Sequence, residues 1–166
     1  ELAAATGRPE KVLGLHFFNP VALMQVVEVV RGAATSEETM NRGRQFVQQI
    51  KKEALMVNRD VAGFVINRIN YPAMIEAMQL VEQGVATVED IDKGLRLGAG
   101  RKMGIFKTGD MVGLDVTYGG LMAMYHETGD SKWFPPLLLR RKVKAGHLGR
   151  KTGRGWYAYH PDGSRK

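Results

Sequence analysis

Two short apolar runs near the amino terminus dominate the first part of the hydrophobic pattern, and they predict β-strands over 12–18 and 25–31. The interior of each run holds one titratable residue, His16 in the first and Glu28 in the second. A carboxylate among valines is costly to bury unless a partner pairs with it. His16 is the obvious candidate for that partner.

The pattern then changes to a helical period. Thr35 and Glu38 have the spacing of a capping box, which predicts the start of a helix. A third short strand is predicted over 54–57. This order of two strands, a helix and a strand is the closing portion of an α/β unit rather than a complete one. The helix places four residues on one face: Met40, Gly43, Val47 and Ile50.

Beyond Asp60 the pattern is helical. A long, broadly apolar helix is predicted from 61 to Gly84, with a kink at Pro72. So wide an apolar surface indicates burial between several helices or in a dimer. Gly119 and Gly120 within a later helix indicate a close approach of two helices.

The change from strands to helices near residue 59 predicts two domains. We predict a mainly α chain in which an α/β portion over 1–58 is followed by an all-helical domain over 59–166. The further helices and one short strand are expected at 87–98, 110–127, 136–145 and 156–159.

Composition narrows the class of protein. The 166 residues are 44% hydrophobic, which is enough to bury a core. No apolar run approaches the roughly 20 residues that span a bilayer, and the first residues lack a signal-type pattern. We therefore expect no membrane partner, and a location in the cytoplasm or an organelle matrix. The absence of cysteine excludes disulfides, thiolate metal sites and cysteine nucleophiles, and we predict no metal site.

The net charge of +7 is concentrated late in the chain, where seven basic residues lie between 140 and 154. Such a cluster either contacts an anionic partner or forms a solvated helix face with a basic tail. No aromatic stacking platform or helix-turn-helix pattern accompanies it, so we expect no nucleic-acid partner. A small molecule that carries phosphate remains a candidate.

Two glycine-rich segments resemble phosphate-binding loops but lack the required context. The segment 98–104 follows a predicted helix, whereas a dinucleotide-binding loop follows a strand and opens a helix. The segment 149–153 contains Lys151 and Thr152, but its leading glycine lies too close to them for a phosphate-cradling loop. We interpret it as a basic turn.

The connection at 19–24 brings His16 and Glu28 together. An antiparallel hairpin centred near residues 21 and 22 places them directly opposite each other. The carboxylate then accepts a hydrogen bond from one ring nitrogen and orients the imidazole, which is how an enzyme builds a general base. A buried pair that only satisfies itself is the alternative. Asn19 at the strand end and Asn67 within a helix are further candidates for a site.

Several segments in order are similar to the L-3-hydroxyacyl-CoA dehydrogenase family. They are Gly14-Leu15-His16-Phe17-Phe18-Asn19-Pro20, Val27-Glu28-Val29, Gly63-Phe64-Val65-Ile66-Asn67-Arg68, Glu89-Asp90-Ile91-Asp92, Leu97-Gly98-Ala99-Gly100, Val112-Gly113-Leu114-Asp115 and Gly149-Arg150-Lys151-Thr152-Gly153-Arg154-Gly155-Trp156-Tyr157. The resemblance covers nearly all of the chain.

The resemblance implies an NAD-dependent oxidoreductase that oxidises the 3-hydroxyl of a 3-hydroxyacyl-CoA, as in β-oxidation or short-chain acyl metabolism. It implies the end of a Rossmann-like domain followed by a helical domain that forms a homodimer. By position, His16 matches the base and Glu28 its orienting partner. Asn67 matches an asparagine that hydrogen-bonds the reacting oxygen. Asn19 matches a residue near cofactor and substrate, and Lys151 one that reaches the cofactor.

The chain also departs from the family pattern. The family commonly has prolines around Met103 and an acidic residue after Phe106, whereas this chain has Lys102, Ile105 and Lys107. Ala62 stands where the family often has a proline before the glycine that corresponds to Gly63. These differences concern the substrate-side loop and the acyl-chain preference rather than the His/Glu pair.

The family carries three further features upstream of the segments quoted above: a glycine-rich loop, an acidic residue that binds ribose, and a catalytic serine. The 166 residues contain none of them. We therefore expect that the chain alone neither holds NAD productively nor turns over substrate, and micromolar binding of NAD in calorimetry would contradict this. Other hypotheses are a dehydrogenase for a sugar acid, part of a multifunctional protein with a hydratase domain, or a helical dimerisation module that is inactive alone.

Overall fold

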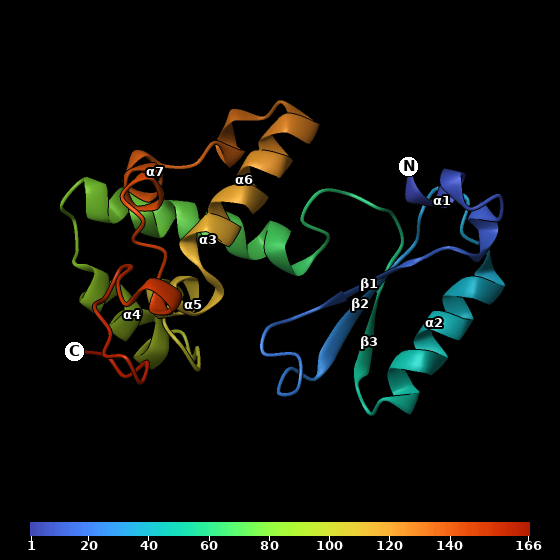
Figure 1. Cartoon of the computed structure of the whole chain (residues 1–166), viewed down its shortest axis with the longest axis horizontal. Coiled ribbons are helices and arrows are strands. Elements are labelled where there is room, and N and C mark those ends of the chain that lie inside the picture. The colour runs from blue at the N-terminus through green and yellow to red at the C-terminus, as the bar shows by residue number, and fades with distance from the viewer. The chain divides into compact units, whose positions relative to one another are not determined.

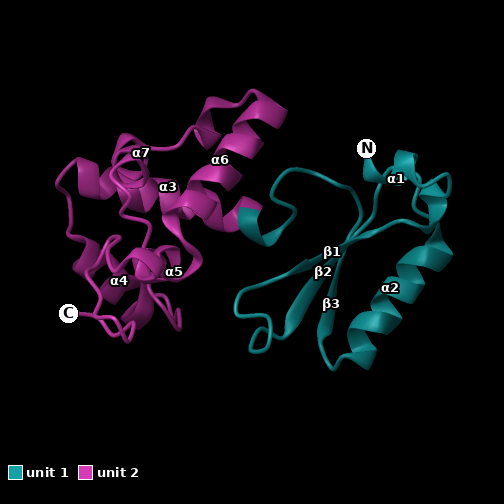
Figure 2. Ribbon diagram, viewed as in Figure 1, with its two compact units in different colours: residues 1–67 teal, residues 68–166 magenta.

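The computed structural model describes residues 1–166, which form two compact units (Figure 2). Unit 1 comprises residues 1–67 and unit 2 comprises residues 68–166. The division falls later in the chain than the boundary expected between 58 and 59. It lies within one helix, α3 (Ile66–Glu82), because the first turn of this helix packs with the sheet of unit 1.

Unit 1 is built on a three-stranded sheet in the order β1 (Gly14–Phe17), β2 (Val26–Val30) and β3 (Glu53–Val57). β1 and β2 are antiparallel, whereas β2 and β3 are parallel. Helix α2 (Glu37–Gln49) makes the connection between β2 and β3 and lies along one face of the sheet (Figure 1). The short elements α1 (Leu2–Ala5) and η1 (Pro9–Lys11) precede the sheet. The predicted strand, strand, helix and strand are therefore confirmed.

The core of unit 1 lies between the sheet and α2. Val27 and Val29 project from one face of β2 and pack against Met40 and Val47 of α2. Because side chains alternate along a strand, Glu28 projects from the opposite face. The same alternation places His16 on the face of β1 that does not carry Leu15 and Phe17.

The capping residue of α2 differs from the prediction. Ser36, not Thr35, is the N-cap, since its side chain accepts a hydrogen bond from the backbone N–H of Thr39. The hydroxyl of Thr35 is used elsewhere, because it donates to the carbonyl of Val12 and accepts from the N–H of Gly32. Thr35 thus joins the entry to β1 with the exit from β2.

Unit 2 is helical, as predicted. After α3 it contains α4 (Val88–Leu97), α5 (Ile105–Val112), α6 (Leu114–Thr128) and α7 (Leu137–Lys144), with the short 3₁₀ helices η2 (Ser131–Trp133) and η3 (Arg150–Thr152). Thr87 caps α4 by accepting from the N–H of Asp90, which confirms the predicted start of this helix.

Two predicted elements of unit 2 are wrong. The single helix expected over 110–127 is two helices, because Gly113 has φ 110° and ends α5 before α6 begins. The strand expected over 156–159 forms only isolated bridges. Its backbone N–H groups at Trp156 and Tyr157 instead donate to the buried carboxylate of Asp110, at 2.8 and 2.9 Å. Burial raises the pKa of Asp110, and these hydrogen bonds oppose that rise.

The close approach predicted for Gly119 and Gly120 holds for one of the two. A Cβ at Gly120 would collide with the hydroxyl of Tyr71 on α3, whereas a Cβ at Gly119 would meet no atom within 4 Å.

We expect Gly119→Ala to raise the free energy of unfolding by about 1 kcal/mol through helix propensity. Gly120→Ala should lower it by about 1–2 kcal/mol through overpacking. Urea denaturation of the two variants measures the difference, and equal effects would contradict it.

None of the helices has both the length and the apolar character that a membrane span requires.

Candidate active site

His16 and Glu28 meet across the first two strands, as the sequence predicts. They are directly paired in the register of β1 and β2. The Nδ1 atom of His16 lies 2.6 Å from Oε2 of Glu28. An ionised carboxylate only accepts hydrogen bonds, so Nδ1 carries the hydrogen and Nε2 is left as the nitrogen that accepts a proton.

The second oxygen of Glu28 is bound by the backbone. Oε1 accepts hydrogen bonds from the N–H groups of Val65 and Ile66, at 3.0 and 2.9 Å. These are donors at the start of α3, where the helix dipole favours a negative charge. Glu28 is fully buried, and these three hydrogen bonds explain how a carboxylate is tolerated there. It serves at once as the partner of a histidine and as the cap of a helix.

A tight turn brings those two N–H groups to Glu28. Gly63 and Phe64 both have positive φ, 76° and 44°. Positive φ is unfavourable for a residue with a side chain, so the conformation of Phe64 is strained. The turn also explains why α3 begins at Ile66 rather than at the predicted residue 61. Strain of this kind is concentrated at functional sites in proteins.

Two aromatic rings flank the imidazole. The ring of Phe18 lies 4.8 Å from that of His16 in an edge arrangement, and the ring of Phe64 lies 5.3 Å away. The side chain of His16 is 29% exposed, whereas that of Glu28 is completely enclosed. The imidazole therefore contacts Glu28 and two aromatic rings and stays partly exposed. This is the geometry of a proton-transfer residue with a buried orienting group.

The other predicted site residues occupy three different places. Asn67 is half-buried in the first turn of α3, next to the Ile66 amide that binds Glu28. Asn19 is exposed, two residues after the end of β1. Lys151 belongs to unit 2, where its Nζ lies 2.6 Å from a carboxylate oxygen of Asp115. The hydrogen bond from Lys151 lowers the pKa of Asp115.

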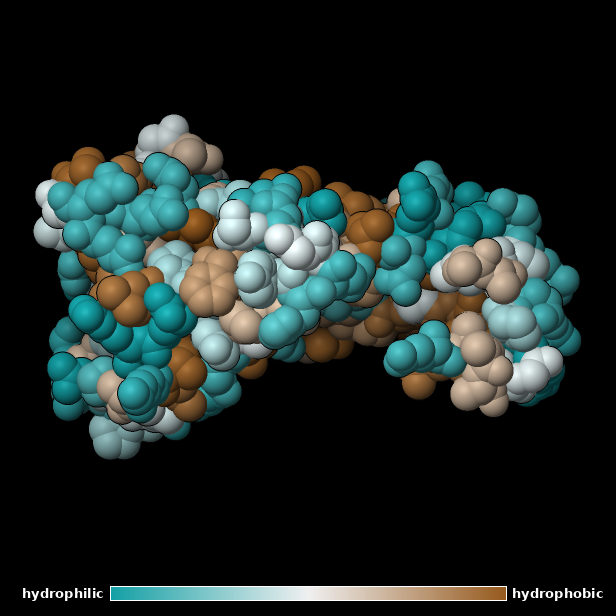
Figure 3. Space-filling view, turned by 90° about the horizontal axis from the view of Figure 1, so that it is seen from above, coloured by the Kyte–Doolittle hydropathy of each residue, from teal (hydrophilic) through white to brown (hydrophobic).

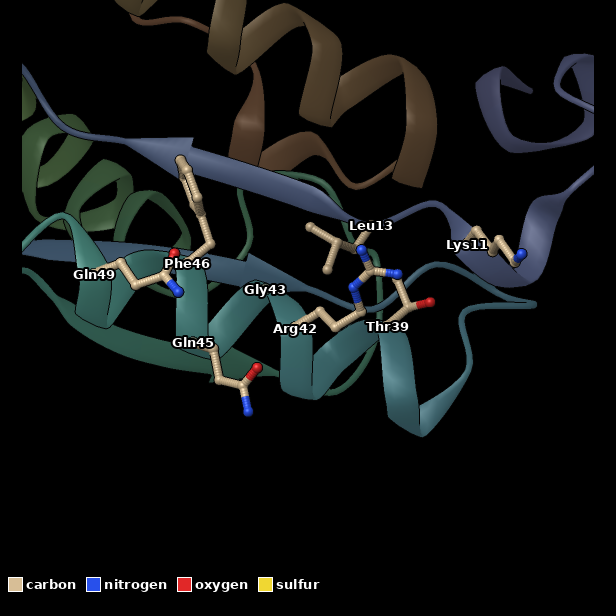
Figure 4. A pocket seen from close by; sticks show the side chains of 8 residues that line it. All are labelled: Lys11, Leu13, Thr39, Arg42, Gly43, Gln45, Phe46 and Gln49. Carbon is tan, nitrogen blue, oxygen red and sulfur yellow. The ribbon is translucent and has the colours of Figure 1, made fainter.

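Unit 1 has a hollow of about 510 Å³ that does not include the His/Glu pair (Figure 4). Arg42, Phe46 and Gln49 line it from α2, and Lys11 and Leu13 line it from the segment that leads into β1 (Figure 4). Its lining includes no histidine and no carboxylate.

Neither unit contains a group of three or more His, Asp or Glu side chains placed to hold a metal ion.

Sequence reasoning identified the pair but missed what holds it. No sequence pattern reveals that the backbone amides of Val65 and Ile66 donate to Glu28, because these hydrogen bonds depend on how the chain folds. The one available signal is Gly63, because a glycine before an apolar run permits the positive φ that the turn requires.

Comparisons with known proteins agree along the chain. Residues 1–61 match the family model described as 3-hydroxyacyl-CoA dehydrogenase, NAD binding domain. Residues 63–159 match 3-hydroxyacyl-CoA dehydrogenase, C-terminal domain. The chain is 46% identical over 159 residues to a probable 3-hydroxybutyryl-CoA dehydrogenase of Bacillus subtilis, covering 96% of this chain and 55% of that protein.

Two further relatives match this chain over nearly all of its length and over about half of their own. A 3-hydroxybutyryl-CoA dehydrogenase of Bradyrhizobium diazoefficiens is 43% identical, with 95% of this chain and 54% of that protein covered. The crystal structure of (S)-3-hydroxybutyryl-CoA dehydrogenase from Ralstonia eutropha superimposes with a TM-score of 0.91 at 42% identity, covering 96% of this chain and 56% of that one. The chain thus spans about half the length of the curated relatives it matches.

Proposed function

Because the chain belongs to the 3-hydroxyacyl-CoA dehydrogenase family, we propose that it carries the acid–base machinery of an NAD-dependent oxidoreductase. The reaction converts the 3-hydroxyl of a 3-hydroxyacyl-CoA to the ketone of a 3-ketoacyl-CoA. The observation that carries the proposal is the 2.6 Å contact between Nδ1 of His16 and the enclosed carboxylate of Glu28. A histidine so held has one nitrogen committed to orientation and one available for chemistry.

In this proposal His16 is the general base. Its Nε2 takes the proton of the substrate hydroxyl as the carbon–hydrogen bond of the same carbon breaks. Bound NAD would supply the acceptor for the hydride that leaves that carbon. The imidazolium that forms at His16 is stabilised by Glu28, whose negative charge is itself held by the amides of Val65 and Ile66. In the reverse direction the same imidazolium returns the proton to the ketone oxygen.

The proposal gives roles to three further side chains, two of unit 1 and one of unit 2. Asn67 donates to the reacting oxygen, a role that its half-buried position in the first turn of α3 supports. Asn19 and Lys151 contact the cofactor. For Lys151 this role requires that its ammonium leave Asp115, and the pair is accessible enough for exchange because both side chains are at least 40% exposed.

We further propose that the protein is a homodimer through its helical unit. Large hydrophobic side chains are exposed on four helices there, among them Ile69 of α3 and Val116 of α6, which are 65% and 51% accessible. In Figure 3, hydrophobic residues lie between hydrophilic ones on the visible face of this unit. Large apolar side chains that are this exposed lose contact with water when a second copy covers them, which favours association.

The activity is tested on the polypeptide encoded by the whole reading frame that includes these residues. We expect it to oxidise NADH with acetoacetyl-CoA, followed by the loss of NADH absorbance, because this substrate presents the ketone at the position that His16 serves. A sugar acid is the matched alternative substrate. Turnover of the sugar acid without turnover of acetoacetyl-CoA would overturn the proposal.

A further inference from the structure

A second cavity lies wholly within unit 2, between α4 and the beginning of α5, with a volume of about 280 Å³. Tyr157 and Arg165 line it from the carboxyl-terminal segment, and Met103 and Gly104 line it from the loop before α5. Its walls carry five cationic side chains, Lys93, Arg96, Lys102, Lys107 and Arg165, against two carboxylates.

Both carboxylates of the cavity are already occupied by donors. Asp92 is 6% exposed, and its oxygens accept from the backbone N–H groups of Phe106 and Lys107 and from the hydroxyl of Tyr157, at 2.9, 3.0 and 2.8 Å. Asp92 thereby caps α5 from inside the unit. Glu89 accepts from the guanidinium of Arg165 at 3.2 Å.

Three of the cations have no acidic partner. Lys93 pairs with Asp90 at 2.6 Å, and Arg165 pairs with Glu89. Arg96, Lys102 and Lys107 form no ion pair with any residue of the chain. They come from α4, from the loop and from α5, so the fold gathers three separate positive charges around one concave space. Like charges gathered in a recess repel one another until an anion neutralises them.

The chemistry of these groups identifies the anion. An arginine presents a planar fork that suits two oxygens of one phosphate, and each lysine supplies a point charge with three donors. Two adjacent phosphates offer enough oxygens and negative charge for all three side chains. We propose that the cavity binds the diphosphate group of a small molecule.

The proposal is independent of the chemistry at His16 and is tested by binding alone. Inorganic pyrophosphate is titrated into the 166-residue chain in an isothermal calorimeter, with ADP as the esterified diphosphate. We expect one saturable site for pyrophosphate. Lys107→Gln and Arg96→Gln should each weaken binding by roughly tenfold, since each removes a charged hydrogen bond. Tighter binding of ADP assigns the site to a diphosphate ester, and weaker binding assigns it to free pyrophosphate.

Lys144→Gln is the matched control, because Lys144 is an exposed lysine of α7 outside the cavity. Lys144→Gln removes one positive charge from unit 2, as Lys107→Gln and Arg96→Gln do. If pyrophosphate binding depends on net charge alone, its affinity falls equally in all three variants. That equality, or the absence of saturable heat with the unmodified chain, overturns the proposal. Backbone NMR shifts of residues 102–107 on addition of pyrophosphate give a second measurement that needs no variant. No shift there would also overturn it.

Discussion

Replacing His16 with glutamine is expected to lower the kcat of the proposed dehydrogenase reaction by about 10²–10⁴, which is the contribution of a positioned general base. Glutamine retains a polar side chain of similar reach but has no basic nitrogen at neutral pH. The NAD dissociation constant should stay nearly unchanged, because the Nε2 atom of His16 acts on the substrate hydroxyl and not on the cofactor. Steady-state kinetics with acetoacetyl-CoA and a separate NAD titration check the two parts.

The glutamine variant must also be folded for this result to count. Far-ultraviolet circular dichroism and a thermal melt establish that, and Lys144→Gln provides a variant with an unaltered site. Turnover within tenfold of the unmodified enzyme would show that His16 is not the base.

Glu28→Gln is expected to abolish most activity while the fold is retained. The amide oxygen can still accept from Val65 and Ile66, and these two N–H groups fix the amide with its NH₂ toward His16. The NH₂ group only donates, so Nδ1 of His16 must then become the acceptor and the hydrogen must move to Nε2. The nitrogen that should take the substrate proton is thereby blocked. A wrong tautomer of this kind lowers kcat by roughly 10⁴ in a serine protease.

Two measurements distinguish this explanation from simple damage. Nitrogen NMR of the His16 ring should show hydrogen on Nδ1 in the unmodified protein and on Nε2 in the glutamine variant. Glu28→Ala, in contrast, leaves both backbone donors unsatisfied and should lower the free energy of unfolding by about 2–5 kcal/mol. Unchanged tautomer and turnover in Glu28→Gln would refute the orienting role.

The sequence allowed the contact between His16 and Glu28 to be predicted because strand pairing is a simple geometric rule. Once the hairpin was placed, His16 had to face Glu28, and the structure confirms the register. The division between an α/β portion and a helical portion followed in the same way from a change of hydrophobic period. Both depend on information that is local in the chain.

The missed features depend on contacts between distant segments. Thr35 has the spacing of a cap, but the carbonyl of Val12 competes for its hydroxyl and Ser36 takes the capping role. Residues 156–159 have the aromatic content of a strand, but Asp110 takes the N–H groups that a neighbouring strand would need. In each case a tertiary partner outcompetes the local preference, and no local pattern reveals which partner wins.

The double use of Glu28 has an evolutionary consequence. Its two oxygens serve different properties, since one orients the base and the other holds the first turn of α3. The shorter side chain of aspartate could keep either the hydrogen bond to His16 or those from the start of α3, and an apolar residue could keep neither. Under the proposed function, selection for catalysis and selection for foldability therefore act on the same side chain. Compensation elsewhere in the chain cannot release this position, because a mutation that restores stability would leave the tautomer uncorrected.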